Sequence, residues 1–276
     1  MTAAPRKRPR GPFGGAALLL AALAAACAAR PATGPTESLS VFAAASLADA
    51  FEAAGQAFSQ ANPGVTVAFN FAASDQLAQQ ILAGAPADVF ASASPGPMQI
   101  VVDGGRVDPQ AVRVFARNRM VVVAPPDNPA GVGGLADLAR PGLRLVLAAP
   151  EVPAGQYAAA ILHEAAGDPA LGFGFEASVR ENVVSYEENV RAVLAKVALG
   201  EADAGLVYRS DALAAGEAVI AIEIPAAWNV VADYPLAPVL GSAAPDAAQA
   251  FLVYLLSPAG QALLAEHGFE PAEPWA

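Results

Sequence analysis

Four short segments of the chain have residues whose type and position suit the binding of an anion. Each ends an expected strand or opens an expected helix with a small polar or apolar residue, and the four are residues 44–47, 72–75, 152–155 and 188–191. A helix N-terminus carries about half a positive charge and several unpaired N–H groups. Helix starts that converge on one point can therefore hold an oxyanion without Lys or Arg. A fifth segment ends in Tyr208, which adds a phenol donor.

Ser46 and Ser74 are the side-chain donors in the first two segments. Both are good N-cap residues, and Ser46 with Asp49 has the spacing of a capping box. Each serine taken alone is better explained as a helix cap than as a ligand contact. Both, however, follow apolar strands at the carboxyl edge of the expected sheet, where open α/β sheets bind ligands. This combination favours a ligand role for the pair.

The remaining segments contribute backbone groups and one aromatic side chain. Pro153, Ala154 and Gly155 suit a first helical turn whose N–H groups point outward, because proline gives up a donor that has no partner there. Tyr208 follows an apolar strand. Its hydroxyl either points into a cleft or lies at the end of a ring packed on the core, and both readings stay open from the strand pattern alone.

Strand and helix patterns alternate along the chain, which predicts an α/β fold with parallel strands. The helix over residues 46–60 places Leu47, Phe51, Ala54 and Phe58 on one face. Strands are expected at residues 38–42, 65–71, 88–91, 120–124, 143–148, 182–185, 204–208, 219–224 and 230–236. The other helices are expected from Ser74 and at residues 96–103, 153–165, 187–199 and 246–267.

The chain of 276 residues is long enough for two lobes once a leader is removed. We expect residues 38–118 plus 231–276 to form lobe 1 and residues 119–230 to form lobe 2. Four basic residues precede the apolar run 16–26, which is typical of an export signal over residues 1–27. Residues 28–37 are expected to be a flexible tether, and no other apolar run is long enough to span a bilayer.

Cys27 is the only cysteine and directly follows three alanines, as in the lipobox of bacterial lipoproteins. The typical lipobox has Leu three residues before the cysteine, whereas Leu23 lies four before it. We favour a lipid anchor at Cys27, because a lone cysteine otherwise has little reason to lie at that boundary. Plain cleavage after an Ala-x-Ala site is the alternative.

The charge of the chain excludes one class of partner. The net charge is −11, and removing the leader's four basic residues leaves 11 basic against 26 acidic residues, or −15. Such a surface repels nucleic acid. It does not exclude a buried anion site made of local dipoles, because distant surface charges are screened.

Six segments resemble the molybdate-binding solute-binding proteins of bacterial ABC importers, the ModA family. They are residues 41–47 (VFAAASL), 69–74 (FNFAAS), 84–93 (GAPADVFASA), 152–157 (VPAGQY), 188–191 (ENVR) and 205–211 (GLVYRSD). The resemblance covers nearly the whole chain after the leader, and the segments keep the family's order. Ala73 departs from the family, which often has Gly there.

The resemblance implies a two-lobed periplasmic-binding-protein fold of type II, with a mostly parallel sheet flanked by helices in each lobe and the ligand in the cleft. It implies that molybdate, and tungstate as well, is contacted by Ser46 and Ser74 from one lobe. Backbone N–H groups of Ala154 and Val190 and the hydroxyl of Tyr208 are implied contacts from the other lobe. Molybdenum would thus be bound only as the oxyanion, with no cofactor.

The resemblance also implies partners and a location. The expected partners are a membrane permease and its ATPase subunit, and the receptor itself is expected to be a monomer. It would work in the periplasm or on the outer face of the cytoplasmic membrane, held to the membrane only by a lipid at Cys27.

Other ligands are weighed by their chemistry. Molybdate, tungstate and sulfate carry no proton at neutral pH, so they need donors only, whereas phosphate would profit from an acceptor carboxylate. Asp75 and Glu188 lie near the expected contacts but should face solvent on a helix's first turn. A small organic acid would favour an arginine clamp by Arg191 or Arg209, of which Arg209 should point away from Tyr208 and Arg191 is expected to be solvated. Sulfate and a small organic acid stay as alternatives.

Catalytic motifs are missing from the sequence. It has no Gly-x-Ser-x-Gly elbow and no His-Glu-x-x-His zinc motif, and its only histidines are His163 and His267. A serine hydrolase would need one of these histidines beside Ser46 or Ser74. We therefore expect a binding protein that transports its ligand unchanged.

Overall fold

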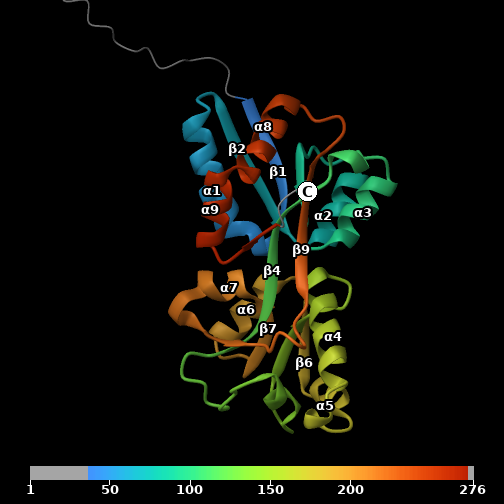
Figure 1. Cartoon of the computed structure of the whole chain (residues 1–276), viewed down its shortest axis with the longest axis vertical. Coiled ribbons are helices and arrows are strands. Elements are labelled where there is room, and N and C mark those ends of the chain that lie inside the picture. The colour runs from blue at the N-terminus through green and yellow to red at the C-terminus, as the bar shows by residue number, and fades with distance from the viewer. Residues whose placement is uncertain (1–36, 273–276) are drawn as a thin grey trace, which may run out of the picture. The chain divides into compact units, whose positions relative to one another are not determined.

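The first lobe is built from the N-terminal strand and helix alternation. The computed structural model describes residues 37–272. Three strands pair in parallel in the order β2, β1, β3, and they are β1 (Glu37–Ala44), β2 (Val65–Ala72) and β3 (Val89–Ala91). The helices between them are α1 (Ala48–Ala61), α2 (Ser74–Leu82) and α3 (Pro95–Asp103). Figure 1 shows α1 and α3 on opposite sides of this sheet, so the strands are covered on both faces.

The second lobe repeats this architecture. Its strands β5 (Leu145–Ala148), β6 (Val183–Glu187) and β7 (Ala204–Tyr208) are parallel, and β8 (Ile220–Glu223) runs antiparallel to β4. Its helices are α4 (Pro153–Ala166), α5 (Phe175–Glu181), α6 (Val190–Ala198) and α7 (Arg209–Ala215). The short 3₁₀ turns of the described chain are η1 (Ala45–Leu47), η2 (Pro109–Ala111), η3 (Leu135–Ala139), η4 (Pro169–Leu171) and η5 (Gly216–Ala218).

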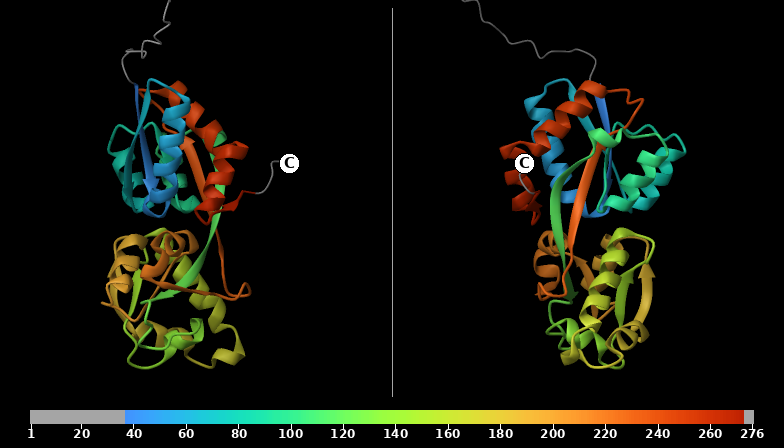
Figure 2. Two further views of the ribbon diagram at one scale, coloured as in Figure 1. Left: turned by 90° about the vertical axis from the view of Figure 1, so that its left-hand side faces the viewer. Right: turned by 45° about the vertical axis from the view of Figure 1, so that its right-hand side comes forward.

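Two long strands join the lobes. β4 (Arg113–Ala124) and β9 (Val231–Pro238) are antiparallel and run from one lobe into the other, as Figures 1 and 2 show. β4 pairs with β9 as far as Arg119, and from Met120 onward it pairs with β7 and β8. β9 brings the chain back to the first lobe. There the chain forms α8 (Pro245–Leu256), α9 (Pro258–Glu266) and β10 (Glu270–Pro271). Two strands are thus the only described backbone that passes between the lobes near the cleft.

The first lobe's core forms where α1 packs on α8. Phe51, Ala54 and Phe58 are at most 2% exposed, which confirms the predicted apolar face of this helix. The ring of Phe251 on α8 meets Phe58 edge to face at a centroid distance of 5.3 Å and Phe51 at 6.0 Å. Such aromatic pairs add about 0.5–1.5 kcal/mol to what burial of their area contributes. This packing holds the start of α1, and with it Ser46, in place.

The structure corrects several predicted boundaries. The expected strand 120–124 is the second half of β4. Its first half, which contains Arg113, Arg117 and Arg119, was not predicted. The expected helix 246–267 is two helices, because Pro258 cannot donate a backbone hydrogen bond and the axes bend by 66° there. The helix expected from residue 187 begins at Val190, since Glu187 still belongs to β6.

The leader lies outside the described residues, and so do Cys27 and the tether except for Glu37, which begins β1 instead of ending the tether. Within residues 37–272 no single helix has both the length and the apolar composition needed to cross a bilayer. Helices α8 and α9 meet that criterion only as a pair, across their bend. Helices α5 and α7, which were not predicted, complete the described fold.

Candidate functional site

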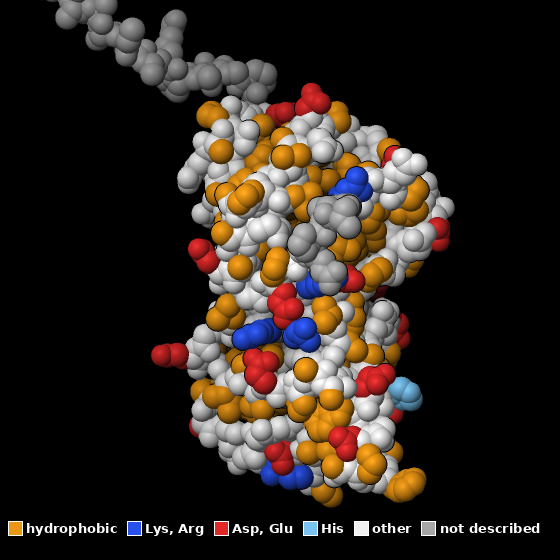
Figure 3. Space-filling view, viewed as in Figure 1, with side chains coloured by type: hydrophobic (Ala, Val, Ile, Leu, Met, Phe, Trp, Pro, Cys, Tyr) orange, Lys and Arg blue, Asp and Glu red, His pale blue; other side chains and the backbone are white. Residues whose placement is uncertain are grey.

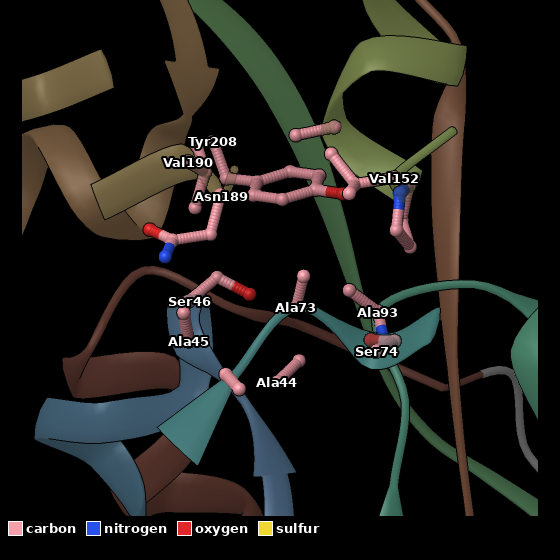
Figure 4. Close-up of a pocket in the computed structure, with 13 residues that line it drawn as sticks. Ala44, Ala45, Ser46, Ala73, Ser74, Ala93, Val152, Asn189, Val190 and Tyr208 are labelled. Carbon is pink, nitrogen blue, oxygen red and sulfur yellow. The ribbon is translucent and has the colours of Figure 1, made fainter. Parts of the chain in front are cut away.

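A small cavity lies where the two lobes face each other. Its volume is about 240 Å³ including the part open to solvent. All five predicted contacts, from both lobes, are among the residues that line it: Ala44, Ala45, Ser46, Ala72, Ala73, Ser74, Ala93, Val152, Pro153, Ala154, Asn189, Val190 and Tyr208. Figure 4 shows residues of the two lobes facing each other across the cavity. A small ion suits this space.

The starts of several helices point at the cavity. The residues just before η1, α2, α4 and α6 are Ala44, Ala73, Val152 and Asn189, and each of them lines the cavity. The first three have no side chain that caps the helix, and only Asn189 does so, through the N–H of Ala192. Backbone N–H groups of the first turns therefore remain available to a ligand, and their dipoles favour negative charge.

The predicted capping role of the two serines is wrong. Ser46 lies inside the 3₁₀ turn η1 and Ser74 is the first residue of α2, so neither is an N-cap. Both side chains are instead buried and bonded to other elements. The Ser46 hydroxyl lies 3.0 Å from the Tyr234 hydroxyl, and Ser74 Oγ accepts a 3.0 Å bond from the N–H of Ala93. Figure 4 shows the Ser46 oxygen directed sideways into the space between the two lobes.

Tyr208 supplies the most unusual polar atom of the cavity. The residue is 1% exposed, and its hydroxyl is buried with no hydrogen-bond partner of good geometry among the described residues. Burial raises the pKa of Tyr208 well above its usual value of 10, with the nearby Tyr234 adding to the shift. The phenol therefore stays protonated at neutral pH. A buried unpaired donor is costly unless a ligand accepts from it.

A close backbone contact holds Ala154 in position. A Cβ atom at Gly155 would lie 1.9 Å from the carbonyl oxygen of Ala149, so only glycine fits there. This contact presses the first turn of α4 against the end of β5. Val190 is held in a comparable way, because Asn189 caps α6 through the N–H of Ala192. The two backbone donors thus lie on turns fixed by local geometry.

Charged side chains surround the cavity without lining it. Arg191 was expected to be solvated, and that is wrong: it forms an ion pair with Asp49 of the first lobe, and its Nε lies 2.8 Å from Oδ1 of the buried Asp211. Burial raises the pKa of Asp211 to about 7 despite the attraction of Arg191. Arg209 is turned toward Glu223 at 3.5 Å and does not line the cavity, as expected.

The two carboxylates beside the site differ from each other. Glu188 is exposed, as predicted. Asp75 faces solvent only in part: the residue is half-buried, its Oδ1 is buried without a hydrogen-bond partner, and burial raises the pKa of this carboxyl. Neither carboxylate lines the cavity. Among residues 37–272 no group of three or more His, Cys, Asp or Glu side chains could hold a metal ion.

Three features of the site escaped sequence reasoning. Ala93 donates to Ser74 although it comes from the loop after β3, and Tyr234 reaches Ser46 from β9, 188 residues along the chain. Asn118 of β4 lies next to that tyrosine, 3.5 Å from its hydroxyl. The only available signal was a lone Asn between arginines in an otherwise apolar strand, at a position that proves fully buried.

Comparisons with known proteins agree with this geometry. The family described as bacterial extracellular solute-binding protein matches residues 39–270. The molybdate-binding protein ModA of Mycobacterium tuberculosis is 41% identical over 259 residues, covering 92% of this chain and 94% of the relative. A putative ABC transporter substrate-binding lipoprotein of Bacillus subtilis, YvgL, is 30% identical, with 92% and 95% covered.

A solved structure shares the fold. The periplasmic molybdate-binding protein of Azotobacter vinelandii superposes with a TM-score of 0.74 at 21% identity, covering 86% of this chain and 100% of that one. The predicted two-lobed fold is thereby confirmed. Because the family model covers most of the chain and the ModA relative matches it nearly end to end, the chain belongs to the bacterial extracellular solute-binding proteins of the ModA family, which serve transport and are not enzymes.

Proposed function

We propose that this protein captures molybdate, and tungstate as well, outside the cytoplasm and delivers it to an ABC permease driven by an ATPase subunit. The observation that supports this most is that neutral hydrogen-bond donors line the cavity. Uncapped helix starts, two serine hydroxyls and the unpaired Tyr208 hydroxyl meet there, and no charged side chain of the described chain lines it. A dianion without a proton needs such donors and no acceptor.

The proposed contacts are Ser46 and Ser74 through their hydroxyls, Ala154 and Val190 through their N–H groups, and Tyr208 through its phenol. Their common lining of one cavity supports this set. The neutral donors would replace the water around the ion, and the lobes would close over it by bending β4 and β9. The change of partners of β4 between Arg119 and Met120 supports lobes of residues 38–118 plus 231–276 and 119–230.

We also propose that the protein works as a monomer at the outer face of the membrane, anchored by a lipid on Cys27, which becomes the N-terminal residue when the chain is cut just before it. The name of the Bacillus relative, a lipoprotein, supports the anchor. Labelling cells with a radioactive or clickable fatty acid tests it: the chain should carry the label, and Cys27→Ser should lose it. An unlabelled chain would mean plain secretion.

Calorimetric titration of the chain without its leader tests the ligand. We expect tight binding of molybdate and tungstate, with sulfate and phosphate at least about a hundredfold weaker. Ser46→Ala and Tyr208→Phe should each weaken molybdate binding about tenfold or more, because each removes a charge-assisted hydrogen bond. Binding of none of the four anions would overturn the proposal, and tighter binding of sulfate would favour the sulfate receptor.

A further inference from the structure

A chain of buried hydroxyl and amide groups lies directly behind Ser46. The Ser46 hydroxyl is 3.0 Å from the hydroxyl of Tyr234, and both residues are at most 3% exposed. Tyr234 does not line the cavity. It belongs to β9, one of the two strands that join the lobes, and its ring packs edge to face on Tyr208 at 5.7 Å. The group behind the first serine is thus held by the link between the lobes.

Asn118 sets the direction of this chain. Its Oδ1 accepts the N–H of Arg119 at 2.9 Å, which fixes the orientation of the amide. The Nδ2 group then faces Ser210 at 2.8 Å and the Tyr234 hydroxyl at 3.5 Å. Because an amide NH₂ only donates, it occupies a lone pair of the tyrosine oxygen and leaves the tyrosine O–H free to donate to Ser46, a direction that the 3.0 Å separation of the two hydroxyls allows.

The protonation state of Tyr234 allows this direction. Burial raises the pKa of Tyr234 well above 10, and the negative charge of Asp211 adds to the rise, so the phenol keeps its proton at neutral pH. The second serine, Ser74, has a backbone N–H group as its partner. Ser74 Oγ accepts the N–H of Ala93, a group that can only donate. When Tyr234 donates to Ser46, a protein donor occupies the oxygen of each serine and leaves its O–H for the cavity.

We propose that Tyr234, oriented by Asn118, is a positioning residue that makes Ser46 a hydrogen-bond donor toward the cavity and so biases the site toward oxyanions that carry no proton. This inference rests on the proposed function and deepens it. Without the tyrosine hydroxyl, Ser46 can turn and accept a hydrogen bond from a protonated ligand. Selection against such ligands would then be set by residues that never touch them.

The experiment compares molybdate with arsenate, a tetrahedral anion that keeps one proton at neutral pH. Both are titrated by calorimetry into the wild type and into Tyr234→Phe, Ser46→Ala and the double variant. Tyr234→Phe should weaken molybdate binding about tenfold, the effect of one hydrogen bond to a charged ligand. Arsenate binding should weaken less or improve, so that the preference for molybdate falls at least about threefold.

The double variant separates positioning from structure. If Tyr234 acts through Ser46, its loss costs little affinity once Ser46 is alanine, and the two effects are not additive. Tyr254→Phe, which removes a hydroxyl on α8 far from the cavity, is the matched control and should change neither affinity. Asn118→Ala, which keeps both hydroxyls and removes the orienting amide, should lower the preference in the same direction and stands in if Tyr234→Phe does not fold.

Two results would overturn the inference. Additive losses for Tyr234→Phe and Ser46→Ala, with molybdate and arsenate weakened equally, would mean that the tyrosine only supports the fold. A wild type that binds neither molybdate nor tungstate would remove the proposed function and this inference with it. Because the wild type alone decides the function and the variants decide the positioning, the two failures are distinguishable.

Discussion

At the scale of the residue, the site depends on groups that are neutral and held rigidly. The unpaired hydroxyl of Tyr208, the Ser74 oxygen that accepts from Ala93 and the Ser46 hydroxyl beside Tyr234 bring neutral polar groups to one small space. Neutral donors suit an ion that must also be released, because they attract a dianion less strongly than an Arg or Lys pair would. The small size of the neighbouring alanines exposes the backbone N–H groups.

Gly155 is the residue at which this rigidity is easiest to test. Gly155→Ala should lower molybdate affinity at least about tenfold and destabilise the fold by about 1–3 kcal/mol, because the added Cβ displaces backbone at Ala149. Calorimetry and urea unfolding measure the two effects. Gly96→Ala is the matched control, since Gly96 lies in the first turn of α3 with open space around it. Equal behaviour of the two variants would refute the close-packing argument.

The sequence predicted the residues of the site better than their local roles. All five expected contacts line the cavity, because strand ends and helix starts are readable from short apolar runs and small residues. The capping roles of the serines were wrong, since a cap depends on backbone angles that a residue type does not determine. Tyr234 and Asn118 could not be found, because only the folded sheet brings β4 and β9 behind the cavity.

At the scale of the element, α1 and α6 are joined across the cleft by one ion pair. Arg191 on α6 contacts Asp49 on α1, and it directly follows Val190, one of the proposed contacts. The same guanidinium lies against the buried Asp211 of α7. The ion pair therefore connects the two lobes directly beside Val190, a proposed ligand contact.

Asp49→Asn isolates the link between the lobes, because it leaves Arg191 with Asp211. We expect molybdate affinity to fall about two- to fivefold, since a half-exposed ion pair contributes up to about 1 kcal/mol. The stability of the ligand-free protein should change by less than about 0.5 kcal/mol. Glu52→Gln, an exposed site on the same helix, serves as control. An unchanged affinity in Asp49→Asn would exclude a role of this pair in closure.

Helices and strands were largely predictable where apolar residues recur at a regular spacing along the chain. The start of α2 and the whole of β7 were predicted at their observed limits. The first half of β4 was missed, because its three arginines and Asn118 interrupt the apolar run and resemble a surface segment, although no residue of this half strand is exposed. Its side chains nonetheless make tertiary contacts, since Nε of Arg119 lies 2.8 Å from Oε1 of Glu270 on β10 in an ion pair.

At the scale of the whole molecule, an acidic protein binds an anion. Figure 3 shows acidic side chains spread over both lobes, with basic ones close beside them on the same face. The net charge without the leader's basic residues is −15, so long-range forces oppose the ligand and only the local dipoles attract it. The net charge of the protein and its affinity for the anion are therefore set by different groups.

The dependence of molybdate affinity on salt concentration tests this explanation. Raising NaCl from about 10 to about 200 mM should increase molybdate affinity, by less than about threefold, because salt screens the repulsion between protein and ligand. A site that relied on Arg or Lys would lose affinity over the same range. Calorimetric titrations at several salt concentrations measure the slope, and a clear fall in affinity would contradict the neutral-donor site.

The most direct measurement is a crystal structure of the protein grown with molybdate, with data collected at the molybdenum absorption edge. We predict one molybdenum peak in the cavity, with oxygens within hydrogen-bond distance of the hydroxyls of Ser46, Ser74 and Tyr208 and of the N–H groups of Ala154 and Val190. A peak elsewhere, or an anion held by Arg191 instead of these donors, would contradict the proposed site.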